Sequence, residues 1–535
     1  MVRRSCASRH SHMRRSSVAP RAVAALALLC AAAPAAEWSS IGLTSGGRPI
    51  RALAVEGAAP DAPRVVVVAG LDGDETAVKL VERETREYAK NRASRRRFHL
   101  TAVPLANPEK ARLVFPPPGA AYRENAEAHY LWRWLGTAAP DLVIVAGGSD
   151  AGLAAALSSH SVAGYGKIPA VVSPARPGFL RTVKLPPHRS EARLELERRL
   201  SRTPAQTARE LAEVYGRDFK DAVYIPAMAL IGQLRLGRVG DVERLAAPFA
   251  GGELDSLAKP TGSHLAGHLL FGELAERTGK SVYTALVRRA AELGFDRRGV
   301  MLEAMPLHLE MSDAVFMGCP ILAKAGKLTG ERKYFAMALR HLRFIQNLCL
   351  RPDGLYRHSP LADAAWGRGN AFPALGLALA LSDIPPEDEA FDPVLRSFQH
   401  HMSALAQWQQ DNGMWRQVID YDGAYAEYSA TAMIAAAMLR GIRSGWLDAK
   451  SYQPRVERAW RAVLARTGSD GKLVDVCEGT GKQKTLEDYL RRAAILGQDA
   501  RGGGMALFLA TELAAAPFPD AAGTRATRSA DSGDK

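Results

Sequence analysis

The stretch from residue 314 to residue 350 decides how most of this chain folds; it reads AVFMGCPILAKAGKLTGERKYFAMALRHLRFIQNLCL. Apolar side chains recur in it every three or four residues, the period of α-helices that bury one face. The same spacing marks five other segments, Leu211–Leu236, Leu265–Leu293, Ala374–Leu381, Ala430–Leu447 and Met505–Ala514. Loops with Gly, Pro and Asp-Gly turns separate them, so the region 190–515 is expected to hold about a dozen helices. This number of helices predicts a toroid of helical hairpins.

The region 37–185 has a different pattern, in which strands alternate with helices. Arg64–Ala69 (RVVVVA) is a continuous β-branched run, typical of a strand buried on both faces. A Gly-rich turn follows it, and then a helical stretch that ends at about Lys90. Further strands are expected at Phe98–Pro104, Asp141–Ala146 and Ile168–Val172. Strands separated by helices predict a mostly parallel α/β sheet.

Length and composition limit the class of protein. The 535 residues exceed what one hydrophobic core usually organises, so two or three domains are expected. Hydrophobic residues make up 47% and charged residues 24%, which are values of a globular chain. The chain has no collagen, heptad or short solenoid repeat, and we expect no membrane span after the leader. The basic run Arg95–Arg97 is better explained by a solvated loop than by nucleic-acid binding, so no nucleic-acid partner is expected.

The first 36 residues have the composition of a secretory signal. Six arginines and no acidic residue precede the apolar segment Val23–Ala33, and small residues follow at Pro34–Ala36. The alternatives are a disordered basic leader or a misassigned start. We expect an exported protein, periplasmic or secreted, with a disordered tail at 516–535.

The cysteines after the leader are Cys319, Cys349 and Cys477. Their odd number and wide spacing favour no disulfide framework and no zinc site. We expect them to be buried, unreactive thiols because their surroundings are apolar.

Polar and aromatic clusters lie at the ends of the apolar helices. They are Glu310–Met317 (EMSDAVFM), Asp353–His358 (DGLYRH), Trp366–Asn370 (WGRGN), Asn412–Gln417 (NGMWRQ) and Glu427–Met433 (EYSATAM). In a toroid of helical hairpins, the central funnel is open to solvent at such helix ends. We therefore expect the functional site there.

The order and spacing of these clusters resemble glycoside hydrolase family 105, the unsaturated rhamnogalacturonyl and glucuronyl hydrolases, which are related to family 88. The late run Cys477–Gly481 (CEGTG), followed by Tyr489 and Asp499, also has a counterpart in that family. The resemblance covers about residues 210–515 and implies an (α/α)6 barrel. It also implies an anionic substrate, an oligosaccharide ending in a 4,5-unsaturated uronic acid, and no cofactor.

The reaction that the resemblance implies needs one acid. Protonation of the vinyl ether at C4, addition of water at C5 and opening of the hemiketal release the neighbouring sugar, so the two carboxylates of ordinary glycosidases are not required. The resemblance makes Asp313 the catalytic acid, in an apolar setting that penalises its ionised form. From the residues alone, Ser312-Asp313 before an apolar helix is an N-cap, and this alternative stays open.

The resemblance also supplies candidate substrate-binding residues. Arg368 is expected to pair with the substrate carboxylate and Trp366 to stack on the sugar ring. The remaining candidates are His264, His358, Asn370, Trp415 and Gln417, and for several of them packing at a helix end is an equal alternative. The family's second aspartate is missing from Lys259–His268 (KPTGSHLAGH), where Ser263 or His264 is the candidate replacement. Glu427 and Thr431 are expected to fix a hairpin rather than to catalyse.

The α/β region resembles the zinc carboxypeptidase family in Ser45–Ile50, in the turn after its first buried strand and in Val103–Pro108. That family binds zinc with His-x-x-Glu and a later His. Asp72 and Gly147 stand where the histidines belong, and only Glu75 remains, so we expect no metal and a degenerate domain.

Three functions therefore stay open. The first is an exported hydrolase of unsaturated uronyl oligosaccharides, and the second is a non-catalytic carbohydrate-binding protein on the same two folds. The third, an active metallopeptidase or amidase, requires a metal where ligands are missing.

Overall fold

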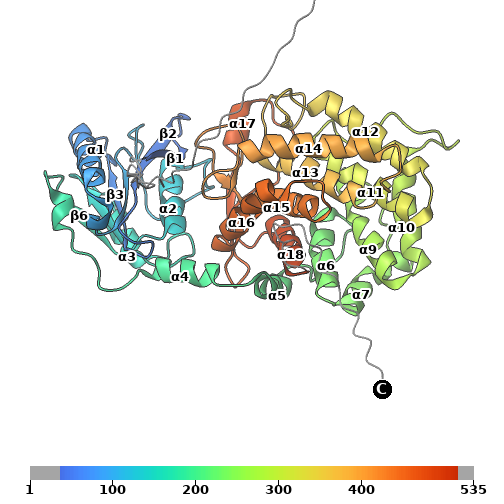
Figure 1. Ribbon diagram of the computed structural model, residues 1–535, viewed down its shortest axis with the longest axis horizontal. Helices are drawn as coiled ribbons and strands as arrows, with labels where there is room; N and C mark the ends of the chain where they lie inside the picture. The colour runs from blue at the N-terminus through green and yellow to red at the C-terminus, as the bar shows by residue number, and fades with distance from the viewer. Residues whose placement is uncertain (1–36, 516–535) are drawn as a thin grey trace, which may run out of the picture.

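The computed structural model describes residues 37–515, in which an α/β domain lies beside a larger helical domain (Figure 1). The proposed signal and the C-terminal tail lie outside the described residues, so export and the disordered tail stay predictions. None of the helices within residues 37–515 is long and apolar enough to cross a bilayer.

Six strands form the sheet of the first domain, in the order β1-β2-β4-β3-β5-β6. Their bounds are β1 Glu37–Leu43, β2 Pro49–Val55, β3 Arg64–Ala69, β4 His99–Val103, β5 Leu142–Ala146 and β6 Ala170–Ser173. The four strands β4, β3, β5 and β6 are parallel, as the sequence predicts. Strands β1 and β2 form an antiparallel hairpin on the β4 edge, which the sequence reading missed because neither is a continuous β-branched run.

Helices cover both faces of this sheet. Helix α1 (Glu75–Lys90) packs on one face, while α2 (Ala126–Ala138) and α3 (Leu153–Ser159) pack on the other. The strand β3 serves both faces because Val65 and Val67 contact the α1 side, and Val66 and Val68 the α2 side. Two 3₁₀ turns, Ala93–Arg95 and Phe179–Thr182, complete the domain.

The second domain is built from two concentric layers of helices. The inner helices are α6 Tyr224–Arg235, α8 Gly262–Gly267 with α9 Leu269–Thr278, α11 Ala314–Thr329, α13 Gly367–Leu381, α15 Tyr428–Arg443 and α18 Ala500–Ala515. The outer helices are α5 Pro204–Val214, α7 Val239–Ala250, α10 Ser281–Ala291, α12 Lys333–Cys349, α14 Phe391–Gln407 and α16 Ala449–Ala465. Neighbouring inner helices contact one another, and α18 contacts α6, so the ring is closed. This is the (α/α)6 barrel that the sequence predicts.

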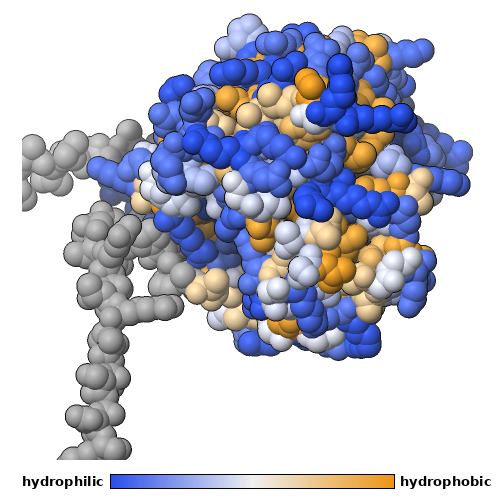
Figure 2. Space-filling view, turned by 90° about the vertical axis from the view of Figure 1, so that its right-hand side faces the viewer, coloured by the Kyte–Doolittle hydropathy of each residue, from blue (hydrophilic) through white to orange (hydrophobic). Residues whose placement is uncertain are grey.

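Burial distinguishes the two layers. Helix α13 is buried around nearly its whole circumference, whereas the outer helices α12 and α14 each keep one exposed, polar face. Gly376 allows α13 to approach α11 closely, because a Cβ there would lie 2.7 Å from the Cα of Phe316. The side of the barrel away from the first domain is largely hydrophilic, with separate hydrophobic areas (Figure 2).

All six inner helices begin at one rim of the barrel, since each follows an outer helix that runs the other way. The connecting loops at this rim carry the remaining short elements. These are η3 Glu292–Gly294, β7 Trp415–Arg416, β8 Ala426–Glu427, β9 Leu473–Cys477, α17 Leu486–Leu490 and β10 Ala494–Gly497.

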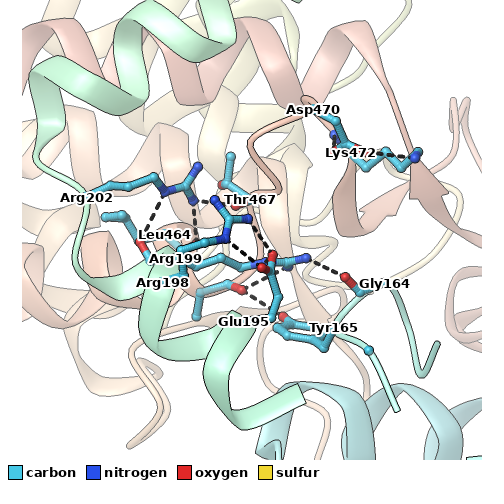
Figure 3. Close-up of polar contacts among 12 residues, drawn as sticks. Gly164, Tyr165, Glu195, Arg198, Arg199, Arg202, Leu464, Thr467, Asp470 and Lys472 are labelled. Carbon is cyan, nitrogen blue, oxygen red and sulfur yellow. Dashed lines mark hydrogen bonds and ion pairs between the residues drawn. The ribbon is translucent and has the colours of Figure 1, made fainter. Parts of the chain in front are cut away.

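Arginines of the linking helix α4 (Glu191–Leu200) and of the residues after it bind the carbonyl end of α16 (Figure 3). Arg199 donates to the carbonyl of Ala465 at 3.2 Å, and Arg202 donates to the carbonyls of Leu464 and Thr467. Tyr165 of the first domain donates to the same Ala465 carbonyl at 2.8 Å, with the guanidinium of Arg199 over its ring. These donors satisfy carbonyls that a helix end leaves without partners, and their positive charge complements the helix dipole.

A buried ion pair joins the two domains at a second point. Arg133 of α2 donates to Oδ1 of Asp475 at 2.6 Å, and the Tyr122 hydroxyl donates to the same oxygen at 2.9 Å. Both charged side chains are 7% exposed. A continuous apolar core surrounds the pair, with α2 residues on one side and barrel residues such as Val418 and Tyr425 on the other.

Removal of this carboxylate is expected to destabilise the docked pair of domains. Asp475→Asn leaves the Arg133 guanidinium buried without a counter-charge, which costs about 3–5 kcal/mol. Asparagine tolerates the left-handed backbone at this position (φ 67°), so the substitution tests the charge. The midpoint of thermal unfolding should fall by several degrees.

Asp470→Asn is the matched control, because Asp470 pairs with Lys472 on the surface of the same loop. Its effect should be within about 1 kcal/mol. Equal midpoints for the two variants would show that the Arg133–Asp475 pair does not hold the domains together.

Candidate active site

Asp313 lies at the barrel rim, directly before α11, and its side chain makes no hydrogen bond to the helix end. Asp313 thus occupies the N-cap position of α11, but its side chain does not cap the helix. The side chain is 13% exposed, and its Oδ1 lies 3.3 Å from Nε2 of the fully buried His358. Ser312 fixes this loop, since its amide donates to the His358 carbonyl and its hydroxyl to the Gly369 carbonyl.

His358 connects Asp313 to Tyr489. Its Nδ1 lies 2.7 Å from the Tyr489 hydroxyl, which also accepts from the amide of Gln483. Burial raises the pKa of Tyr489, so its hydroxyl keeps its proton. When that proton is donated to Nδ1, the imidazole carries its own proton on Nε2, facing Asp313. His358 thus lies between Tyr489 and Asp313, although its Nε2 and Oδ1 of Asp313 make no hydrogen bond to each other within the described residues.

Arg368 supplies a positive charge at the same rim. It donates to the carbonyls of Cys477 and Glu478, both at 2.9 Å, and to the Ser429 hydroxyl at 3.2 Å. No carboxylate of residues 37–515 lies within ion-pair distance of it. Burial lowers the pKa of Arg368, but the nearby Cys477 and Glu427 more than offset this and raise it overall. The guanidinium therefore remains charged and without a carboxylate counter-ion.

Tyr224, the first residue of α6, completes the surroundings of this charge. Its ring meets Phe316 and Phe372 edge-on, and burial raises the pKa of its hydroxyl to about 12. The sequence reading did not select Tyr224, and it used Tyr489 only as part of a motif. Neither could be placed beside Asp313 without the closed ring of inner helices.

Similarity to known proteins identifies the family of this chain. The model of Glycosyl Hydrolase Family 88 matches residues 258–516. Protein Atu3128 of Agrobacterium fabrum is 30% identical over 166 residues, which cover 28% of this chain and 71% of that protein. The chain belongs to glycosyl hydrolase family 88.

Two further relatives carry activities in their names. The unsaturated rhamnogalacturonyl hydrolase YesR of Bacillus subtilis is 28% identical over 186 residues, covering 33% of this chain and 52% of that protein. The unsaturated 3S-rhamnoglycuronyl hydrolase of Formosa agariphila is 30% identical over 181 residues, which cover 30% of this chain and 48% of that protein. The chain spans about half the length of these two relatives. A solved family 105 glycoside hydrolase of C. acetobutylicum is 20% identical, covers 58% of this chain and 99% of its own, and has a TM-score of 0.49.

Several residues expected to bind substrate in this family 88 chain have structural contacts instead. Asn370 is fully buried, accepts from the Tyr356 amide and donates to the carbonyls of Tyr356 and Trp366. Trp415 is fully buried, and its indole N–H donates to the Leu405 carbonyl. Both residues therefore fix the loops at the rim, which corrects their interpretation as sugar contacts.

Trp366 also needs correction. It is 1% exposed, because its ring packs against His358 at 4.5 Å and lies under the guanidinium of Arg368 at 4.8 Å. No open ring face remains for a sugar in this structure, so Trp366 orients these two side chains. Gln417 is fully buried, and its side-chain amide donates to the backbone carbonyl of Tyr489 at 2.7 Å. It therefore helps to position Tyr489.

His264 is turned away from this group. Its Nδ1 accepts from the Thr261 amide, and its Nε2 lies 2.9 Å from Oδ1 of the exposed Asp221. The structure thus brings together Asp313, His358, Trp366, Arg368 and Gln417, and it records no contact between His264 and them. Glu427 caps α15 through the amides of Ser429 and Ala430, the hairpin-fixing role expected for it.

The three cysteines of residues 37–515 are buried and free. Burial raises the pKa of Cys319 and of Cys349 to about 12, so their thiols keep their protons at neutral pH. Residues 37–515 contain no cluster of three or more His, Cys, Asp or Glu side chains able to hold a metal. Asp72 instead accepts from the Asp74 amide, and Asp74 caps α1.

Loss of the Tyr489 hydroxyl tests the buried chain. Tyr489→Phe leaves Nδ1 of His358 without its partner in a buried site, which costs about 1–3 kcal/mol. The midpoint of thermal unfolding should fall. Tyr452→Phe on the outer helix α16 is the control, because no hydrogen bond of that hydroxyl is recorded, and it should leave the midpoint unchanged. A stable Tyr489→Phe protein would contradict a structural His358–Tyr489 bond.

Proposed function

We propose that this protein is a glycoside hydrolase that removes a 4,5-unsaturated uronic acid from the non-reducing end of an oligosaccharide. The observation that carries the proposal is the Asp313 carboxyl group, free of the helix end, partly exposed and next to His358. The charged Arg368 at the same rim suits the uronate carboxylate. The names of two relatives describe this substrate class.

The chemistry needs one proton donor. Asp313 transfers its proton to C4 of the vinyl ether, which leaves an oxocarbenium ion at C5. Water adds at C5, and its proton returns to the Asp313 carboxylate. The resulting hemiketal opens to a C5 ketone, and the hemiacetal left at C1 then releases the neighbouring sugar. Nε2 of His358 lies beside this carboxyl group, 3.3 Å from its Oδ1.

The first domain is proposed to be a degenerate carboxypeptidase-like module without peptidase activity. Its parallel strands and helices on both faces suit that origin, and Asp72, which stands at one lost ligand position, accepts from the Asp74 amide in the turn before α1. In this proposal the domain holds the rim loops of the barrel in place and catalyses no second reaction. Export to the periplasm or medium belongs to the same proposal, since the first 36 residues have the composition of a secretory signal.

Ultraviolet absorbance of the conjugated uronate measures the reaction directly. Incubation with lyase-generated unsaturated disaccharides should make this absorbance fall. Asp313→Asn should lower kcat/KM by a factor of about 10²–10⁴, which is the usual contribution of a general acid, and should leave the unfolding midpoint close to that of the unmodified protein.

Asp296→Asn is the control, because Asp296 lies in the same connection between α10 and α11 and its side chain accepts from the amides of Arg298 and Val300. It should keep full activity. If the absorbance stays constant with every unsaturated disaccharide tested while binding is still measurable, the protein is instead a non-catalytic carbohydrate-binding protein.

A further inference from the structure

A cavity of about 690 Å³ lies between the two domains. Strands β1 and β2 and helix α2 form one wall, and the loop after α14, the β7–β8 hairpin and the end of α16 form the other. None of its lining residues belongs to the candidate active site. The cavity exists only because the first domain is docked on the barrel.

Three tryptophans line this cavity. Trp38 comes from β1 and is 40% exposed, Trp134 comes from α2, and Trp408 follows α14. Flat, amphipathic rings at a wet surface suit the apolar faces of sugar rings. The amide side chains of Gln407, Gln410 and Asn412 also lie along the wall and suit hydroxyl groups.

An arginine without a partner gives the cavity its charge. Arg466 is 8% exposed, and no hydrogen bond or ion pair of its side chain is recorded within residues 37–515. Its Nε is fully buried and unpartnered, as are Nε of Arg416 and Oε1 of Gln410. A buried charge without a counter-ion is costly, so this site is suited to receive an anion.

The carboxylates in the wall do not supply that anion. Asp475 is engaged by Arg133 and Tyr122, and Asp422 by Ser40 and Arg416. Asp411 is exposed, and no ion pair to Arg466 is recorded for it. Arg51, in contrast, adds another positive charge to the opposite wall.

We propose that this interdomain cavity binds an acidic oligosaccharide, with a uronate carboxylate on Arg466 and Arg416 and with sugar rings against the tryptophans. The site is separate from the barrel rim and does not depend on catalysis by Asp313. It would hold a longer acidic chain close to the hydrolase and so raise the local concentration of chain ends.

Titration calorimetry with saturated oligosaccharides tests this proposal on the whole protein. The probes are tetragalacturonic acid and a saturated glucuronate-containing tetrasaccharide, neither of which carries the double bond. At least one should bind, more weakly at high salt, and its fully methyl-esterified form should bind at least tenfold more weakly.

Arg466→Met should weaken binding of the acidic probe at least tenfold. It should leave the unfolding midpoint unchanged or raise it, because it removes an uncompensated buried charge. Trp38→Ala should also weaken binding. The matched control is Arg461→Met, at an exposed arginine of α16, the helix that ends directly before Arg466, and this variant should bind normally.

Asp313→Asn should bind these probes like the unmodified protein, and Arg466→Met should still hydrolyse unsaturated disaccharides, so the two proposals fail separately. Three results would overturn the cavity proposal. They are absence of binding for both probes, equal binding of the esterified form, and normal binding by Arg466→Met.

Discussion

The contact between the α/β domain and the loop 466–499 is the constraint on which the rest of the site depends. Arg133 and Tyr122 hold Asp475 in that loop, and the α4 arginines hold the end of α16 from which the loop departs. The same loop supplies the Cys477 and Glu478 carbonyls that receive Arg368. It also carries Tyr489 to His358 and hence to Asp313. The first domain thus fixes the position of the candidate acid without touching it.

This dependence gives the first domain a function that needs no catalysis of its own. The sheet of the first domain carries α2 on one face, and α2 packs against the barrel in one continuous core. The interdomain cavity is a second consequence of the same packing, since its tryptophans come from both domains. Stability, active-site geometry and the proposed second binding site are therefore coupled through one interface.

Much of the fold could be predicted from the sequence because the signals were local. The β-branched run of β3 and the three- and four-residue spacing of α11 and α12 identify a buried strand and paired helices directly. The edge hairpin of β1 and β2 was missed, since short strands on a sheet edge carry a weaker pattern. Asp313, His358 and Arg368 were found through a motif resemblance. Their partners were not, because Tyr489 lies 131 residues from His358 and meets it only when the barrel closes.

The misassigned residues have a common physical reason. Trp366 and Asn370 stand at the start of α13 and Trp415 in the short strand β7, and at such ends of elements polar and aromatic groups either face a ligand or bind orphan backbone groups. Sequence spacing cannot separate these two uses. The structure separates them by burial and by the number of hydrogen bonds already made.

The central claim is that Asp313 protonates C4 of an unsaturated uronate, and nuclear magnetic resonance of the reaction in D₂O tests it most directly. The account predicts that the vinyl H4 signal disappears and that a deuteron enters at C4 as the neighbouring sugar is released. With Asp313→Asn, the H4 signal should persist and no deuteron should enter at C4. Release of the sugar with the C4–C5 double bond intact would contradict it, because attack would then have occurred at the anomeric carbon.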